Sequence, residues 1–315
     1  MKTIKLPGFG SLGAQAIDID LNTASDLDLM DLGALVFNEL VVYVDAKGAS
    51  ISPQRYHYIQ SLWGNPVVSN ARPKLEELIK QEGMTKLIAE TLSDIKKMRG
   101  GLEDLRGMIR VTGIKDEKGR RTGMFADGEL EWHSNQQSDN SGYAPLIGLQ
   151  GVEGTEGSST EFLQTVDAFN DLSQELQSEV RELIAIHSFD KDKICKGTSD
   201  SQALITQMHL VPNDGAEMPV IATAPNSMTG MHFPWTSIVG FKGYSQKEFE
   251  SLYTTLVNHL WQDKYVYKHM WKDGEIVWMD QIVTLHRRPG TDTGKRLLHR
   301  MCSDWSNILN DSLHY

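Results

Sequence analysis

The chain has 315 residues, of which 40% are hydrophobic, so it is long enough to bury a substantial core. Its formal net charge of −11 argues against polyanionic partners, and we expect neither nucleic acid nor an anionic membrane surface as a partner. Cys195 and Cys302 lie far apart without CxxC spacing, which excludes a disulfide scaffold and a thiolate zinc site.

The N-terminal residues MKTIKLPGFG contain no apolar stretch of signal-peptide length, and the apolar run at residues 35–44 is too short to span a bilayer. These features predict a cytoplasmic protein. No repeat or Pro/Gly/Ser-rich linker interrupts the chain, so we expect one domain over residues 1–315. Whether it forms a homo-oligomer is left open.

Near the N-terminus, Gly8, Gly10 and Gly13 have the spacing GxGxxG of a dinucleotide-binding loop. Such a loop needs a strand before it and a helix after it. Pro7 interrupts the few preceding residues, and the following AQAIDIDL alternates like a strand. We therefore expect an irregular loop here and no nucleotide site.

The first predicted elements are a buried strand over residues 35–44 and a helix over residues 52–63, with Pro53 in its first turn. A long amphipathic helix begins at Pro73. Its apolar residues recur at three- and four-residue spacing, and the pair Gly100-Gly101 ends it.

Short strands and a few helices follow. Residues 108–114 form a predicted strand, and the turn-rich KDEKGRRTG indicates a hairpin leading toward residues 129–134. Residues 173–186 are amphipathic, and Ser245 with Glu248 makes a capping box before a helix. Further strand-like runs are residues 143–152, 207–211, 219–224, 264–270, 275–279 and 296–304. Many short strands with outer helices predict a β-sandwich or jelly roll with helical cover.

Two of the ten histidines stand in informative settings. His133 lies in ELEWHSNQQ, at the end of a strand-like run, and His286 follows an alternating run and precedes a turn. Residues two apart in a strand project to one face, so His133 and Asn135 can point at one ion. A third ligand from a distant strand would complete the facial site that a non-haem Fe(II) oxygenase uses, although that site has two histidines and a carboxylate.

The segment from Trp132 to Arg300, which contains both histidines, resembles the TauD/TfdA family of Fe(II)- and 2-oxoglutarate-dependent dioxygenases. The family's His-x-Asp motif falls on His133 and Asn135, and its conserved threonine falls on Thr160 in GSSTEF. This resemblance implies a double-stranded β-helix, a jelly roll that is mainly β with helical cover.

The distal motifs of the family match as well. Its G-D-x-x-x-W-D-N run falls on residues 274–281, and the histidine after that run falls on His286. Its closing R-x-x-x-R pair falls on Arg296 and Arg300. The order and spacing of several motifs make the resemblance specific.

The resemblance implies a role for each matched residue. The implied Fe(II) ligands and catalytic residues are His133, Asn135 and His286. Arg296 and the Thr160 hydroxyl would bind the C5 carboxylate of 2-oxoglutarate, since a guanidinium donates two parallel hydrogen bonds to a carboxylate. Arg300 would lie nearer the C1 carboxylate and contact an anionic substrate. The implied activity oxidises a C–H bond of a small molecule with dioxygen and releases succinate and CO2.

The sequence says less about the substrate than about the metal and the cosubstrate. Polar, Gly/Ser-rich stretches predict lid segments near residues 136–143 and 189–202. The candidate substrate contacts are Trp132, Gln137, Tyr143 and Arg300. Neighbouring amide side chains favour a small polar metabolite over a hydrocarbon.

Asn135 departs from the family, which has Asp or Glu at this position. An amide oxygen is neutral and a weaker ligand for a hard cation than a carboxylate. Asn135 is therefore a variant ligand of a working oxygenase, or it leaves a position to an exogenous anion such as chloride, as in related halogenases, or it marks a chain with impaired catalysis.

Two other functions compete with an oxygenase. One is a non-catalytic jelly-roll binding protein. The other is a cupin-like isomerase, which leaves Thr160, Arg296 and Arg300 unexplained.

Overall fold

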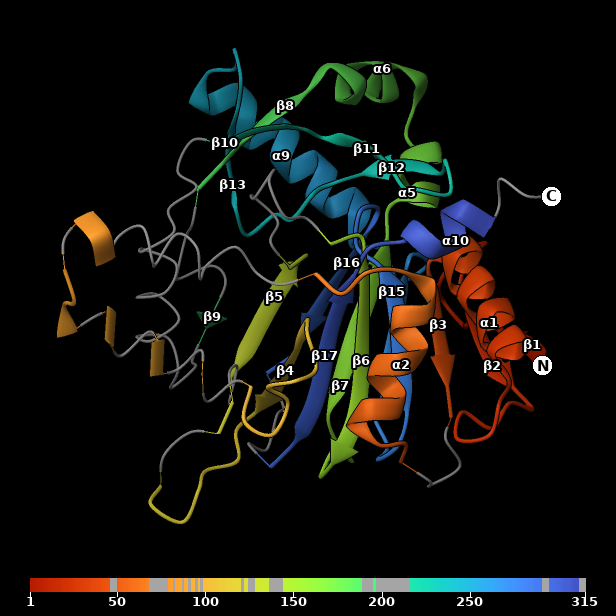
Figure 1. Cartoon of the computed structure of the whole chain (residues 1–315). Helices are drawn as coiled ribbons and strands as arrows, with labels where there is room; N and C mark the ends of the chain where they lie inside the picture. Colours follow the sequence, from red (N-terminus) through yellow and green to blue (C-terminus); the bar gives the residue numbers. More distant parts are fainter. Residues whose placement is uncertain are drawn as a thin grey trace.

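Two β-sheets packed face to face form the centre of the molecule, and helices cover their outer faces (Figure 1). The computed structural model describes the chain apart from residues 46–49, 68–78, 82, 87, 90–91, 94–95, 97–98, 120–121, 124–127, 136–143, 189–194, 197–215, 291–294 and 312–315. The two packed sheets with helices outside them form the expected jelly roll with helical cover.

The larger sheet has seven strands in the order β1-β2-β3-β15-β6-β17-β4. Their bounds are β1 Lys2–Lys5, β2 Ala14–Ile17, β3 Val41–Val44, β15 Ile276–Asp280, β6 Leu146–Glu153, β17 Leu297–Ser303 and β4 Met108–Thr112. All neighbours pair antiparallel except β2 and β3. Both faces of β15 are buried, which fits its almost continuous apolar sequence.

The second sheet has five strands in the order β14-β7-β16-β5-β9. Their bounds are β14 Val266–Met270, β7 Ser159–Gln164, β16 Thr284–Arg288, β5 Glu129–His133 and β9 Cys195–Lys196. Side chains of both sheets meet in one buried cluster, in which Ile147, Val277 and Met279 of the larger sheet accompany Phe162 and Tyr267 of the second. The candidate site is built at this interior.

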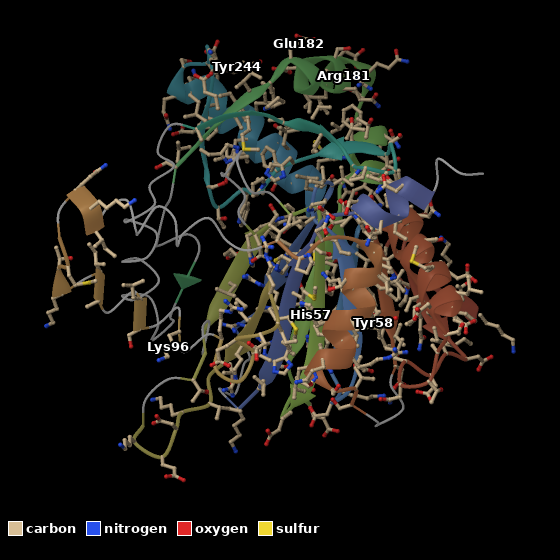
Figure 2. All side chains as sticks on the ribbon, in the orientation of Figure 1. His57, Tyr58, Lys96, Arg181, Glu182 and Tyr244 are labelled. Carbon is tan, nitrogen blue, oxygen red and sulfur yellow. The ribbon has the colours of Figure 1, made fainter. Side chains whose placement is uncertain are left out.

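Helices α1 (Asp26–Glu39) and α2 (Pro53–Trp63) cover the outer face of the larger sheet, together with α10 (Ser306–Asp311) (Figure 1). The face of α2 that carries Tyr56 and Trp63 is buried, whereas Tyr58 is exposed on the other face (Figure 2). A side chain on Gly148 of β6 would collide with the Tyr56 hydroxyl, so only glycine lets α2 approach this closely.

The outer face of the second sheet is covered by α9 (Gln246–Leu260) and α5 (Val166–Asn170), which share a buried cluster with it. Small sheets and α6 (Gln174–Glu182) extend this end of the molecule (top in Figure 1). Their strands are β8 Ile184–His187, β10 Ala216–Pro219, β11 Ile221–Thr223, β12 Thr229–Met231 and β13 Ile238–Phe241.

Several predicted elements are confirmed. Helix α2 begins after Ser52, whose side chain accepts from the Arg55 backbone N–H, and Pro53 occupies the first turn. The capping box of Ser245 and Glu248 begins α9 as expected. The GxGxxG stretch is a loop, followed by β2 as its alternation predicts.

One prediction is wrong and a second is wrong in part. Residues 35–39 end α1, and only Val41–Val44 form a strand. The helix arises because Ser25 and Asp28 form a capping box before apolar residues at helical spacing. The predicted hairpin is half right: its turn is present, since the Thr122 backbone N–H donates to the Ile114 carbonyl at 3.2 Å, but the strands on either side do not pair. Strand β4 pairs with β17, whereas β5 pairs with β16 and β9 in the other sheet.

Other boundaries need adjustment. The amphipathic segment at residues 173–186 divides into α6 and β8. Within the helix predicted from Pro73, the described residues are helical at 79–81, 86, 88–89, 92–93 and 96, but residues 83–85 are not helical, and Gly83 has a φ of 77°. The start of this helix lies outside the described part. The run at residues 207–211 also lies outside it. Among the described residues, none of the helices is long and apolar enough to cross a membrane.

Candidate active site

His133 and His286 face each other inside the jelly roll. They are paired across β5 and β16, and their ring centroids lie 4.2 Å apart. The β5–β16 register shifts just beyond this pair, at Arg288. Antiparallel pairing thus brings together two residues that are far apart in the chain, close enough for one metal ion to lie between their ring nitrogens.

The protonation of both rings suits metal binding. Nδ1 of His133 lies 2.6 Å from the Glu131 carbonyl, which assigns the proton to Nδ1 and leaves the Nε2 lone pair available. Burial lowers the pKa of His133 to about 4, and the positive charges of Arg300 and Arg288 also lower it. Burial, then the His133 ring and Arg300, hold the pKa of His286 well below its usual value. Both imidazoles are therefore neutral at neutral pH.

Asn135 is held by two contacts from distant parts of the chain. Nη1 of Arg300 donates to its Oδ1 at 2.7 Å, and its backbone N–H donates to Oε1 of Gln281 at 2.8 Å. Because arginine only donates, the first contact identifies the amide oxygen. That oxygen keeps a second lone pair, so the contact with Arg300 does not prevent it from binding a cation.

Gln281, which sequence reasoning did not single out, holds the backbone of Asn135. Its side chain is fully buried and also donates to the carbonyl of Ala144, while its backbone N–H donates to the carbonyl of Pro145. It thereby fixes the two points at which the chain enters and leaves residues 136–143. Its signal in the sequence was its place directly after Asp280 in the family's W-D-N motif.

The outer side of the β5–β16 pair is held by a cation–π and salt-bridge cluster. The guanidinium of Arg287 lies 4.7 Å from the ring centroid of Trp132 and 2.6 Å from Oε2 of Glu161. Trp132 packs in the buried cluster beneath α9, on the side of β5 opposite His133. This placement argues against the substrate contact expected of Trp132.

Thr160 and Arg296 are both buried, at 4% and 3% exposure. Thr160 pairs with His269 of β14, and its Oγ1 accepts a hydrogen bond from Nε1 of Trp271 at 2.9 Å. Arg296 immediately precedes β17, the strand that carries Arg300. Trp271 was not predicted as a site residue.

Charged side chains of both signs act on His133. Arg288 is buried, donates from Nε to the carbonyl of Gly128 at 2.9 Å, and together with Arg300 lowers the pKa of His133, whereas the carboxylate of Glu131 raises it. Within the described ranges, no group of three His, Cys, Asp or Glu side chains is placed to hold a metal ion. Among the described residues, Asn135 is the candidate third donor beside the two histidines.

The remaining predicted site residues cannot be placed. Gln137 and Tyr143 lie outside the described residues, as does the lid segment at residues 136–143. The second lid segment, residues 189–202, is described only at the backbone of Cys195 and Lys196, which form β9.

The sheet order and the interior site define a double-stranded β-helix. A family model described as "Taurine catabolism dioxygenase TauD, TfdA family" matches residues 77–302. The chain therefore belongs to this family.

Individual relatives agree with this assignment. The alpha-ketoglutarate-dependent 2,4-dichlorophenoxyacetate dioxygenase of Burkholderia sp. (strain RASC) is 29% identical over 172 residues, which cover 54% of this chain and 56% of that protein. The chain thus matches little more than half the length of this relative.

Solved structures show the same fold at low identity. A taurine dioxygenase from Burkholderia xenovorans superposes with a TM-score of 0.66 and 15% identity, covering 96% of this chain and 88% of the other. A structure of AAD-2 in complex with Mn(II) and N-oxalylglycine gives a TM-score of 0.66 and 16% identity, covering 96% and 97%.

Proposed function

We propose that the protein is an Fe(II)- and 2-oxoglutarate-dependent oxygenase that oxidises a C–H bond of a small polar metabolite. The observation that carries this proposal is the pair of facing, neutral imidazoles of the half-buried His133 and the buried His286. Membership of the TauD/TfdA family supports it.

The proposed ligands match the number of protein donors that such a metal site needs but not their charge. Two neutral imidazoles and the Oδ1 of Asn135 give three donors, but none is an anion. The proposed ligands are His133, His286 and Asn135. When bound together, Fe(II) and 2-oxoglutarate supply the capacity to oxidise a C–H bond with dioxygen, with release of succinate and CO2.

The proposed cosubstrate contacts are Arg296 and Thr160. A buried guanidinium suits a carboxylate because it donates two parallel hydrogen bonds, and an acceptor with negative charge compensates for its burial. The Thr160 hydroxyl supplies a further donor.

The proposed substrate carries an anionic group that contacts Arg300. The guanidinium of Arg300 donates to the neutral amide oxygen of Asn135, and because position 135 carries no carboxylate, this contact does not neutralise the charge of Arg300. The substrate named for the Burkholderia relative, 2,4-dichlorophenoxyacetate, is itself a carboxylate. We extend that chemical class, and not that compound, to this chain.

We further propose that residues 1–315 act as one domain in the cytoplasm, without nucleic acid as a partner. The grounds are the uninterrupted sequence, the two cysteines without paired spacing and the net charge of −11.

Turnover of 2-oxoglutarate tests the proposed function. Protein loaded with Fe(II) should consume dioxygen and form succinate, and a panel of small carboxylates should reveal a substrate that raises both rates. Arg296→Ala should abolish succinate formation, because removing one partner of a buried charged pair costs about 3–5 kcal/mol.

Arg181→Ala is the matched control for Arg296→Ala. Arg181 lies on α6 at the far end of the molecule, where its guanidinium packs 4.8 Å from the ring centroid of Phe169 (Figure 2). Its loss should leave turnover unchanged. Metal and 2-oxoglutarate bound without any succinate would instead favour a non-catalytic binding protein, and turnover that requires chloride would favour halogenase-like chemistry.

A further inference from the structure

Trp271 contacts Thr160 deep inside the jelly roll. Trp271 directly follows β14, and its indole Nε1 donates to Oγ1 of Thr160 at 2.9 Å. Both side chains are buried, at 2% and 4% exposure. The contact joins residues that are 111 positions apart in the chain.

The chemistry of this contact determines what the threonine can offer. An indole N–H is a donor and never an acceptor, so Oγ1 of Thr160 must be the acceptor. The hydroxyl hydrogen of Thr160 is then directed to another partner. A hydroxyl held in this way presents a donor, which is what a carboxylate requires.

A buried polar network fixes the indole of Trp271. Its ring meets the ring of His269 edge-on, with centroids 4.5 Å apart and an interplanar angle of 84°. His269 in turn lies between Tyr267 and Glu275, with Nδ1 3.0 Å from the Tyr267 hydroxyl and Nε2 3.1 Å from Oε2 of Glu275. The backbone N–H of Trp271 also donates to the Ser158 carbonyl at 3.1 Å.

Hydrogen bonds in a buried network restrict the orientation of its members. The carboxylate of Glu275 accepts from the backbone N–H of Lys272 at 2.8 Å, whereas Nε2 of His269 lies within ion-pair distance of Glu275 and has no hydrogen-bond partner among the described residues. The segment from Tyr267 to Glu275 is therefore restrained mainly at Tyr267, Lys272 and Trp271, and Trp271 is the residue that reaches Thr160.

We propose that Trp271 is a positioning residue for the cosubstrate: its indole N–H engages Oγ1 of Thr160 and so directs the threonine hydroxyl toward the C5 carboxylate of 2-oxoglutarate. This inference rests on the proposed function, in which Thr160 and Arg296 bind that carboxylate. Trp271 itself does not touch the cosubstrate.

A double-mutant cycle on cosubstrate affinity tests this role. 2-Oxoglutarate is titrated calorimetrically into Mn(II)-loaded protein without oxygen, so that binding is measured and turnover is not. Trp271→Phe keeps the aromatic packing and removes the N–H, and it should weaken 2-oxoglutarate binding about five- to tenfold, the effect of one hydrogen bond. Thr160→Val should weaken binding at least as much. The double variant should bind no more weakly than Thr160→Val alone, because Trp271 acts through the hydroxyl.

Trp278→Phe is the matched control. Trp278 is also buried, and its indole N–H donates to Oε1 of Gln60 at 3.2 Å, on the other face of the larger sheet. Its loss should lower the melting temperature as Trp271→Phe does and leave the affinity for 2-oxoglutarate unchanged. Thr160→Ser, which keeps the hydroxyl, should retain most of the affinity.

Four results would overturn the inference. Unchanged affinity in Trp271→Phe, or additive weakening by the two substitutions, would mean that Trp271 acts elsewhere. If Arg296→Ala weakens binding and Thr160→Val does not, the proposed function stands and the positioning role fails. If neither variant changes the affinity, the proposed cosubstrate site itself is wrong.

Discussion

Asn135 determines the charge of the candidate site. In place of an anionic ligand it offers one amide oxygen, already accepting from Arg300, so residue 135 does not neutralise a divalent ion held at His133 and His286. The cosubstrate and the substrate would then supply negative charge that a carboxylate at this position would otherwise provide. Affinity for the metal should consequently depend on 2-oxoglutarate more strongly than in a site with a carboxylate ligand.

Substitution of Asn135 tests this charge balance. Asn135→Asp should tighten Fe(II) binding about tenfold or more, because a carboxylate is a stronger ligand for a hard cation. Asn135→Ala should weaken binding, since the oxygen is lost. Metal titrations with and without 2-oxoglutarate check this order. Equal affinity in all three forms would mean that residue 135 does not bind the metal.

The same variants report on catalysis. If Asn135 is a degraded ligand, Asn135→Asp should raise succinate formation. If the native reaction uses the amide, Asn135→Asp should eliminate product while leaving 2-oxoglutarate decarboxylation uncoupled from it. Succinate and product measured together distinguish these outcomes.

Gln281 should matter to the metal site without touching it. Gln281→Leu removes the acceptor of the Asn135 backbone N–H and leaves buried polar groups unsatisfied, at a cost of about 1–3 kcal/mol in stability. Loss of such an outer-shell contact should also weaken metal binding about tenfold. Gln150→Leu is the control, since Gln150 is equally buried but donates to the carbonyl of Ile51. A similar loss of metal affinity in both variants would contradict a specific role for Gln281.

At the scale of elements, helix starts were the most predictable features. The capping box of Ser245 and Glu248 satisfies the first-turn donors of α9, whose apolar face covers the second sheet. Ser245→Ala should lower the free energy of unfolding by about 1 kcal/mol and leave the affinity for 2-oxoglutarate unchanged. Urea unfolding and calorimetry check both parts. A change in affinity would mean that α9 is coupled to the site.

The wrong predictions have physical causes. The run at residues 35–44 is apolar throughout, and such a run does not distinguish a buried helix from a buried strand. Here the capping box at Ser25 favours a helix, which extends to Glu39. Leu40, whose φ is 65°, ends this helix and separates it from β3. The strand pairing of the hairpin after β4 was wrong because pairing depends on β17 and β16, which come much later in the chain.

In the candidate site, too, some residues were predicted from the sequence and others were not. The order of motifs was sufficient to predict His133 and His286, which the structure brings together. The supporting residues could not be predicted in this way. Trp271 contacts a residue 111 positions away and Gln281 one 146 positions away, and neither contact leaves a periodic pattern in the sequence.

At the scale of the whole molecule, one buried carboxyl should govern part of the pH dependence of stability. Burial raises the pKa of Asp280 to about 7, although the backbone N–H groups of Val283 and Ile282 oppose this. The folded state therefore holds a proton that the unfolded state releases near its ordinary pKa of 3.8. Stability from this group is fully present below the unfolded pKa of 3.8, falls as the pH rises from there, and has been lost once the pH passes the folded pKa of about 7.

Asp280→Asn removes this titration and keeps an oxygen for both backbone donors, which Oδ1 accepts at 2.8 and 3.1 Å. The stability of the variant relative to the natural protein should rise between pH 4 and pH 7, by on the order of 1.4 kcal/mol per unit at most, and then level off. Urea unfolding of the metal-free protein across this range checks it. A difference independent of pH would mean that Asp280 does not titrate there.

We propose that the facing histidines hold a metal to which 2-oxoglutarate binds. Visible absorption of the Fe(II)-loaded protein under anaerobic conditions tests this binding, because a 2-oxo acid bound to Fe(II) gives a charge-transfer band. A stoichiometric amount of 2-oxoglutarate should produce the band in the natural protein and in His259→Ala, whose imidazole contacts the Ala168 carbonyl far from the site. The band should be lost in His286→Ala. No band in the natural protein, or an undiminished band in His286→Ala, would mean that these histidines do not hold the metal.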